Sequence, residues 1–262
     1  MAEQQIRFDD GASYEKFMGV WSRKAGDVFL DWTAPPKGLN WIDVGCGNGA
    51  FTELLVKRFA PSHVLGVDPS DAQLTFARER HTANVAEFVK ADAMALPADD
   101  SSFDAAVMAL VIFFVPEPAK GVAEMRRVVK PGGLIAAYAW DMMGGGFPLN
   151  VMYDELEQMG IAPLMPPSAD ASKIDALRGL WEDAGLAEVE TREITVERSF
   201  PGYEDLWATN LTSPRLSQTI TGLTTEACEL LKARVKERLS PASDGSITCT
   251  ARAHAIKGRV PG

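Results

Sequence analysis

The stretch Trp41-Ile42-Asp43-Val44-Gly45-Cys46-Gly47-Asn48-Gly49-Ala50-Phe51-Thr52-Glu53 decides the fold. Its apolar, β-prone start predicts a short buried strand, and a helix is expected to begin directly after the glycines. Glycine accepts positive φ and, without a side chain, lets a ligand lie against the backbone. The free N–H groups at the start of the helix point back at the turn. The stretch therefore predicts a nucleotide-sized ligand site.

Strands and helices alternate along the chain after this turn. Strands are expected at 39–44, 63–67, 86–90, 103–109 and 134–140, with helices at 50–59, 71–80 and 118–129. This order predicts a parallel sheet with helices on both faces. Two later strands, 187–197 and 247–257, are expected to form a final hairpin that includes the antiparallel strand. The predicted fold class is α/β, with a doubly wound, mostly parallel seven-stranded sheet.

The segments outside this alternation are expected to be helical. A helix is predicted over 14–32, shorter helices over 150–159 and 173–184, and a helical stretch over 203–239 that breaks near Pro214. We expect a single domain over 1–262, with an N-terminal lid helix at 13–32 and a cofactor-binding core at 39–140. The segments 141–170 and 200–245 are expected to be helical cap insertions that form the substrate side.

Composition narrows the class of protein. The formal net charge of −10 argues against nucleic acid as a partner, since phosphate binding needs a basic face. Three widely spaced cysteines predict neither disulfides nor a metal site and suit a reducing cytoplasm. The longest apolar run, 105–115, is too short for a membrane span. A small-molecule partner in the cytoplasm is expected, and the oligomeric state is left open.

Three acids end three consecutive predicted strands. Asp43, Asp68 and Asp92 would meet at the carboxyl edge of the sheet, where open α/β folds bind ligands. A dinucleotide site is an alternative, because Ala50 can replace the third glycine of G-x-G-x-x-G. Asp43 argues against it, since dinucleotide strands usually run apolar up to the first glycine. Taken singly, Asp68 is also compatible with a helix-capping role and Asp92 with a solvated loop acid.

The ordered set of motifs resembles the class I S-adenosylmethionine-dependent methyltransferases, in particular the small-molecule group that includes the quinone-biosynthesis enzymes. The resemblance covers residues 14–140, and its motifs are Ile42-Asp43-Val44-Gly45-Cys46-Gly47-Asn48-Gly49, Gly66-Val67-Asp68-Pro69-Ser70, Lys90-Ala91-Asp92-Ala93-Met94-Ala95-Leu96-Pro97, Phe103-Asp104 with the apolar run to Val115, and Val129-Lys130-Pro131-Gly132-Gly133-Leu134. It implies a Rossmann-like methyltransferase fold with S-adenosylmethionine as the cofactor.

The resemblance also implies roles for individual positions. Asp43 and the backbone of Gly45, Cys46, Gly47 and Asn48 would hold the methionine part of the cofactor. Asp68, followed by Pro69, would bind the ribose, and Asp92 with the backbone of Ala93 and Met94 would frame the adenine. Ala109 and Leu110 would line the amino end of the cofactor. Tyr14 or Trp21 of the lid helix would cover the sulfonium, since an aromatic face attracts a cation; for Trp21, packing on the core is the equal alternative.

The acceptor side is less defined by sequence. Phe113 and Phe114 stand where many relatives carry histidine, so Phe113 and Phe147 are expected to form an apolar acceptor pocket. No catalytic base is identified; Tyr138, Asp141, Tyr153 and His254 are candidates by position alone. The expected function is methyl transfer from S-adenosylmethionine to a small, partly apolar acceptor. An NAD-type oxidoreductase and a non-catalytic cofactor-binding regulatory protein are the alternatives.

Overall fold

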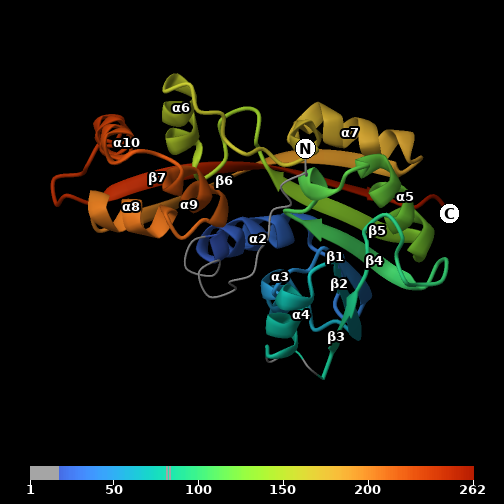
Figure 1. Cartoon of the computed structure of the whole chain (residues 1–262). Coiled ribbons are helices and arrows are strands. Elements are labelled where there is room, and N and C mark those ends of the chain that lie inside the picture. The colour runs from blue at the N-terminus through green and yellow to red at the C-terminus, as the bar shows by residue number, and fades with distance from the viewer. Residues whose placement is uncertain (1–17, 81, 83) are drawn as a thin grey trace.

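A seven-stranded sheet in the order β3-β2-β1-β4-β5-β7-β6 forms the centre of the computed structural model, which describes residues 18–80, 82 and 84–262 (Figure 1). The strands are β1 Asn40–Val44, β2 His63–Asp68, β3 Ala86–Lys90, β4 Phe103–Ala109, β5 Val129–Trp140, β6 Ala187–Phe200 and β7 Ile247–Arg259. The first five pair in parallel, and β7 runs antiparallel to both β5 and β6. The sheet is therefore mixed, with its antiparallel strand in the predicted hairpin.

The helices lie on both faces of this sheet. They are α2 Val20–Thr33, α3 Ala50–Phe59, α4 Asp71–Arg78, α5 Pro118–Val128, α6 Asn150–Gln158, α7 Ile174–Asp183, α8 Tyr203–Asn210, α9 Pro214–Thr221 and α10 Thr225–Glu237, with 3-10 turns η2 Ile112–Phe114 and η3 Ala169–Ser172. On one face the Tyr138 ring packs against Phe29 of α2 and Phe51 of α3. On the other, Trp181 of α7 donates from Nε1 to the Ile135 carbonyl at 3.2 Å.

The strands and helices of residues 39–140 agree closely with the predicted ones, except that β5 begins at Val129 and not at the predicted residue 134. One later prediction is wrong in detail. The predicted stretch 203–239 breaks twice, at Leu211–Ser213 and again at Gly222–Thr224. Pro214 begins α9, as its missing N–H allows. Thr224 caps α10 by accepting from Ala227 N at 3.2 Å, so a second helix start follows the glycine.

The last two strands extend past their neighbour. β5 ends at Trp140, opposite Ala253, whereas β6 and β7 stay paired as far as Phe200 and Ile247. Between them the chain forms α8, α9 and α10, and Figure 1 shows these helices and α6 around that end of β6 and β7. The two helical segments are joined, because Arg234 Nε of α10 lies 2.6 Å from Glu155 Oε2 of α6.

The core is continuous across both faces of the sheet. Its largest fully buried side chains include Trp21, Trp41, Trp140, Trp181 and Tyr138. Burial of this much apolar surface is the main stabilising contribution, about 25 cal/mol for each Å² removed from water. Within the described part of the chain, no helix has the length and apolar character needed to cross a bilayer.

Candidate active site

The glycine turn joins β1 to α3 at the carboxyl edge of the sheet. Gly45, Gly47 and Gly49 all have positive φ, between 53° and 76°. At Gly45 a Cβ atom would lie 2.5 Å from the Val111 side chain, so only glycine fits there. At Gly47 a Cβ would meet nothing closer than Gln73 Oε1 at 3.8 Å, which leaves the backbone open to a ligand. The predicted turn is thus packed against Val111 at Gly45, whereas a ligand can approach its backbone at Gly47.

Asp43 is fully buried at the end of β1, on the face covered by α3. Thr52 Oγ1 of α3 donates to Asp43 Oδ2 at 2.6 Å, and the other carboxylate oxygen, Oδ1, has no hydrogen-bond partner in the part of the chain that the structure describes. Burial raises the pKa of Asp43 to about 7; the Thr52 hydrogen bond lowers it, and the nearby Asp68 charge raises it. The site therefore holds a carboxyl group that changes charge near neutral pH and lacks one partner.

Asp68 links the glycine turn to the start of α4. Its Oδ2 accepts from Gly47 N at 3.0 Å and its Oδ1 accepts from Ser70 N at 2.8 Å. Ser70, rather than Asp68, caps α4, since its hydroxyl accepts from Gln73 N at 3.3 Å. Burial raises the pKa of Asp68, while these two N–H donors lower it. Each carboxylate oxygen keeps a second lone pair for a ligand hydroxyl.

Asp92 follows β3 and is exposed at the same edge of the sheet. Its Oδ1 accepts from Met94 N at 2.8 Å, which fixes the tight turn 92–95 and the Ala93 backbone within it. Ala91 N donates to the Asp68 carbonyl at 3.2 Å, so the ends of β2 and β3 stay adjacent. The third predicted acid therefore lies beside the second, with its side chain open to solvent.

The end of β4 closes the edge on the other side of β1. Leu110 has a φ of 64°, uncommon for a residue with a branched side chain, and its N–H donates to the Tyr138 carbonyl at 2.8 Å. This kink turns the chain across Gly45 and into η2, where Phe113 is buried. Ser168 N donates to the Phe113 carbonyl at 3.0 Å, so the segment after α6 is held against η2. Ala109 and Phe114 remain half-buried.

The predicted lid residues are only partly described. Trp21, in the first turns of α2, is 1% exposed and belongs to the core, which supports the packing alternative for this residue. Tyr14 lies outside the described residues. Phe147 is half-buried, and its ring lies 5.5 Å from that of Tyr153, between centroids. The two rings bring together a predicted pocket residue and a predicted candidate base.

The other candidate bases fall into two groups on opposite faces of the sheet. The Tyr138 hydroxyl donates to the Ser22 carbonyl at 3.5 Å, on the α2 face. Asp141 and His254 lie together on the α7 face, where His254 Nε2 is 4.0 Å from Asp141 Oδ2. Asp141 also binds Arg252 at 2.6 Å and accepts from Gly144 N at 2.7 Å. Sequence reasoning did not bring these residues together, since they are far apart in the chain.

Thr52 is the site residue that the sequence could have revealed and did not. It lies in the first turn of the helix after the glycines, where a side chain points back toward the strand end. A small hydroxyl residue at that place is a recognisable signal for a partner to Asp43. The Arg252–Asp141 pair gives no such local signal.

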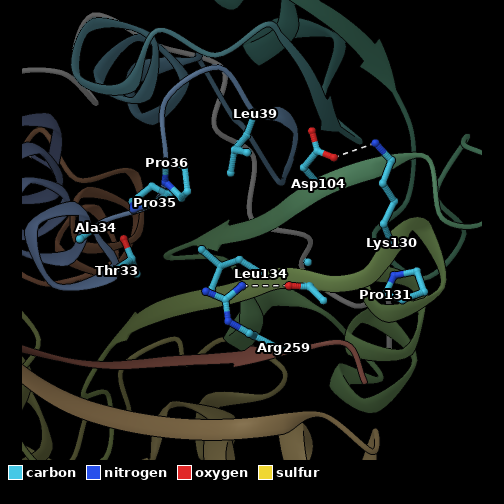
Figure 2. Close-up of a pocket in the computed structure, with 12 residues that line it drawn as sticks. Thr33, Ala34, Pro35, Pro36, Leu39, Asp104, Lys130, Pro131, Leu134 and Arg259 are labelled. Atoms are coloured by element: carbon cyan, nitrogen blue, oxygen red, sulfur yellow. Dashed lines mark hydrogen bonds and ion pairs between the residues drawn. The ribbon is translucent and has the colours of Figure 1, made fainter. Parts of the chain in front are cut away.

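A hollow lies at the opposite edge of the sheet (Figure 2). Its volume is about 270 Å³, and it is lined by residues that precede β1, begin β4 and end β7, among them Leu39, Asp104 and Arg259. Lys130 Nζ lies 2.7 Å from Asp104 Oδ1 across this hollow. Its described lining includes no predicted site residue, so it is separate from the glycine turn.

Comparison with known proteins gives one consistent result. A family model described as a methyltransferase domain matches residues 42–137. The chain is 34% identical over 178 residues to the demethylmenaquinone methyltransferase of Clavibacter sepedonicus, covering 62% of this chain and 71% of the relative. It is 34% identical over 174 residues to the fatty-acid O-methyltransferase of Mycolicibacterium smegmatis, covering 66% of this chain and 60% of the relative.

A solved structure shows the same fold. Phosphoethanolamine N-methyltransferase 2 of Haemonchus contortus, in complex with phosphomonomethylethanolamine and S-adenosylhomocysteine, superposes with a TM-score of 0.57 at 18% identity. The superposition covers 97% of this chain and 58% of that one. At this identity the likeness concerns the fold alone.

Proposed function

Because the chain belongs to the class I S-adenosylmethionine-dependent methyltransferases, we propose that it transfers the cofactor's methyl group to a small, partly apolar acceptor. The observation that carries the proposal is the buried carboxyl group of Asp43, one oxygen of which has no partner among the described residues, just before the turn in which the Gly47 backbone is open. A buried polar atom without a partner costs about 1–3 kcal/mol, and a bound ligand would remove that cost.

The residues at the edge of the sheet fit the cofactor. Asp43 Oδ1 is free to accept from the ammonium of the methionine part, and the Gly47 backbone gives room for it. Asp68, already fixed by two backbone N–H groups, offers its remaining lone pairs to the ribose hydroxyls. We assign the adenine to the exposed turn around Asp92, Ala93 and Met94. Ala109 and Leu110 would lie at the amino end of the cofactor.

When bound, S-adenosylmethionine supplies a methyl group on a sulfonium, which is a good leaving group without acid assistance. The chain's task is then to align the acceptor in line with that methyl and to exclude water. A base is needed only for an acceptor that must lose a proton early. Phe113 and Phe147 would supply the apolar wall, and Tyr153 is a candidate base whose ring contacts Phe147.

We further propose that 13–32 acts as the lid and that 141–170 and 200–245 form one acceptor-side cap on the core 39–140. The ion pair between Glu155 of α6 and Arg234 of α10 supports this, because it joins the two cap segments. Three free cysteines support a reducing, cytoplasmic setting. The relatives' names point to apolar acceptors, a demethylmenaquinone in one case and a fatty acid in another.

Two measurements test the proposal. Isothermal titration should show binding of S-adenosylhomocysteine and none of NADH; the reverse result would favour the oxidoreductase. Incubation with methyl-labelled S-adenosylmethionine and a panel that includes 1,4-dihydroxynaphthalene, a prenylated naphthoquinol and dodecanoate should then label a product. Tight cofactor binding with no labelled product from the panel would contradict a small apolar acceptor of these kinds.

A further inference from the structure

Trp140 is the last residue of β5, at the carboxyl edge of the sheet, and is 1% exposed. Side chains alternate along a strand, so Trp140 lies on the same face as Tyr138, whose ring packs on Phe29 and Phe51. That is also the face of Asp43, since Asp43 pairs with Val107 and Val107 with Ala136. Trp140 therefore shares a face with the proposed cofactor site.

The register also sets how far Trp140 lies from Asp43 along the strands. Ala136 is at the level of Asp43, and Trp140 is four residues further toward the carboxyl edge, about 13 Å at 3.3 Å per residue. β4 ends at Ala109, the partner of Tyr138, so Trp140 extends beyond the end of β4. This places it past the predicted amino end of the cofactor, on the side where an acceptor must approach.

The indole nitrogen of Trp140 is buried, and no hydrogen-bond partner for it lies among the described residues. A buried indole N–H usually finds one, and its absence costs about 1–3 kcal/mol. The residues that follow the ends of β4 and β5 at this edge, Leu110, Ile112, Phe113 and Met142, are buried and apolar. A buried donor at such an edge is suited to a ligand atom that apolar side chains cannot bind.

Trp41 provides an internal comparison. Its indole nitrogen is also buried, again with no partner among the described residues, and it lies on the same face of the sheet as Asp43. Both indoles belong to the core, but Trp41 precedes Asp43 in β1 and lies away from the carboxyl edge. An unpartnered indole alone therefore does not mark a ligand site; Trp140 differs from Trp41 in its place at the edge.

We propose that Trp140 is a specificity-determining residue, whose indole N–H donates a hydrogen bond to an oxygen of the bound acceptor. This rests on the proposed function and narrows the acceptor to molecules with a carbonyl, carboxylate or hydroxyl oxygen on an apolar body. The indole N–H can only donate a hydrogen bond and does not ionise near neutral pH. Trp140 therefore selects and orients the acceptor and takes no proton from it. An oxygen that gains negative charge as it attacks is held more strongly by such a donor.

The test uses the whole protein with ¹⁵N-labelled tryptophan indoles, saturated with S-adenosylhomocysteine so that no turnover occurs. The chain has six tryptophans, and the variants Trp140→Phe and Trp41→Phe assign the two resonances of interest. The probes are 1,4-dihydroxynaphthalene and 1,4-dimethylnaphthalene, which have nearly the same shape and differ in their oxygens. We expect the hydroxylated probe to move the Trp140 indole proton downfield, the dimethyl probe to leave it nearly in place, and Trp41 to respond to neither.

The heat of binding shows whether the hydroxylated probe binds. If it binds and the Trp140 resonance does not move, or moves equally with both probes, the proposal is overturned. In turnover, Trp140→Phe should raise the KM of an oxygenated acceptor about three- to tenfold, as expected for loss of one neutral hydrogen bond. Trp41→Phe should leave that KM unchanged. Absence of methyl transfer would count against the proposed function alone, because the resonance measurement reports binding.

Discussion

Thr52 Oγ1 donates to one oxygen of the Asp43 carboxyl group at 2.6 Å, and the other oxygen has no partner within residues 18–80, 82 and 84–262. The hydrogen bond favours the charged carboxylate, while full burial favours the neutral acid, and burial is the larger effect on the pKa of Asp43. The cofactor-free protein therefore holds a carboxyl group near its midpoint of titration at neutral pH.

The stability of the cofactor-free protein should reflect this raised pKa. Between about pH 4 and pH 7 the folded state keeps a proton on Asp43 that the unfolded state has lost, so this contribution to stability declines as pH rises and levels off above about pH 7. Asp43→Asn cannot ionise. We expect its melting temperature, relative to the parent protein, to be higher at about pH 8 than at about pH 5. A constant difference across this range would contradict a raised pKa.

Cofactor binding should release protons. The ammonium of S-adenosylhomocysteine favours ionised Asp43, so at about pH 7 binding should expel roughly half a proton per site, and affinity should rise between about pH 6 and pH 7.5. Calorimetry in two buffers of different ionisation enthalpy measures the proton directly. The release should disappear in Asp43→Asn; a parent protein that releases none would exclude Asp43 as the linked group.

Thr52→Val should weaken cofactor binding, although the Thr52 side chain acts only through Asp43. Loss of the hydroxyl removes the donor that stabilises the charged carboxylate, so the pKa of Asp43 should rise further. We expect the Kd of S-adenosylhomocysteine at about pH 7 to increase roughly tenfold, as for a hydrogen bond to a charged group. Thr52→Ser keeps the hydroxyl and should remain within about twofold of the parent protein.

Gly45→Ala should destabilise the fold more than an equivalent change at Gly132. Both glycines have positive φ, 74° and 77°, but a Cβ at Gly45 would lie 2.5 Å from Val111 and one at Gly132 would meet nothing within 4 Å. Urea unfolding of Gly132→Ala measures the backbone cost, about 1–2 kcal/mol. Gly45→Ala should add about 1–3 kcal/mol from overpacking. Equal losses would mean that Val111 moves aside freely.

Glu155→Gln should loosen the two proposed cap segments from each other. The Glu155 side chain is 5% exposed and pairs with Arg234 at 2.6 Å and Arg238 at 3.2 Å. Because both arginines reach solvent, we expect a loss of about 1–2 kcal/mol in the free energy of unfolding. Asp154→Asn is the matched control: the Asp154 side chain is 36% exposed, pairs with Arg238 at 3.2 Å and accepts from Asn150 Nδ2 at 2.9 Å, and its replacement should cost less than about 0.5 kcal/mol.

The sequence predicted the parts of the site that depend on local pattern. The glycine turn, the strand ends at Asp43, Asp68 and Asp92, and the helix starts are set by neighbours within a few residues, and their positions in the structure agree. The parallel register then brings the strand ends together, because successive strands of such a sheet share one carboxyl edge.

Other features depend on contacts between distant parts of the chain. Asp141 binds Arg252, which lies 111 residues later, and their approach follows from the pairing of β5 with β7 rather than from either local sequence. The unpartnered indole of Trp140 could not be predicted from the sequence either, because the local pattern indicates only that this residue is the apolar end of a strand. For Trp21 the sequence allows two equal interpretations, packing on the core or covering the sulfonium, and only tertiary packing decides between them.

The strand order has a consequence for synthesis on the ribosome. β7 is the last of the described strands to be made, yet it lies between β5 and β6. Until residue 259 has left the exit tunnel, β5 has an open edge and β6 has no neighbour in the sheet. The nascent chain therefore carries an unpaired, aggregation-prone edge through the translation of more than a hundred residues, and its cooperative folding must wait for the arrival of its final strand.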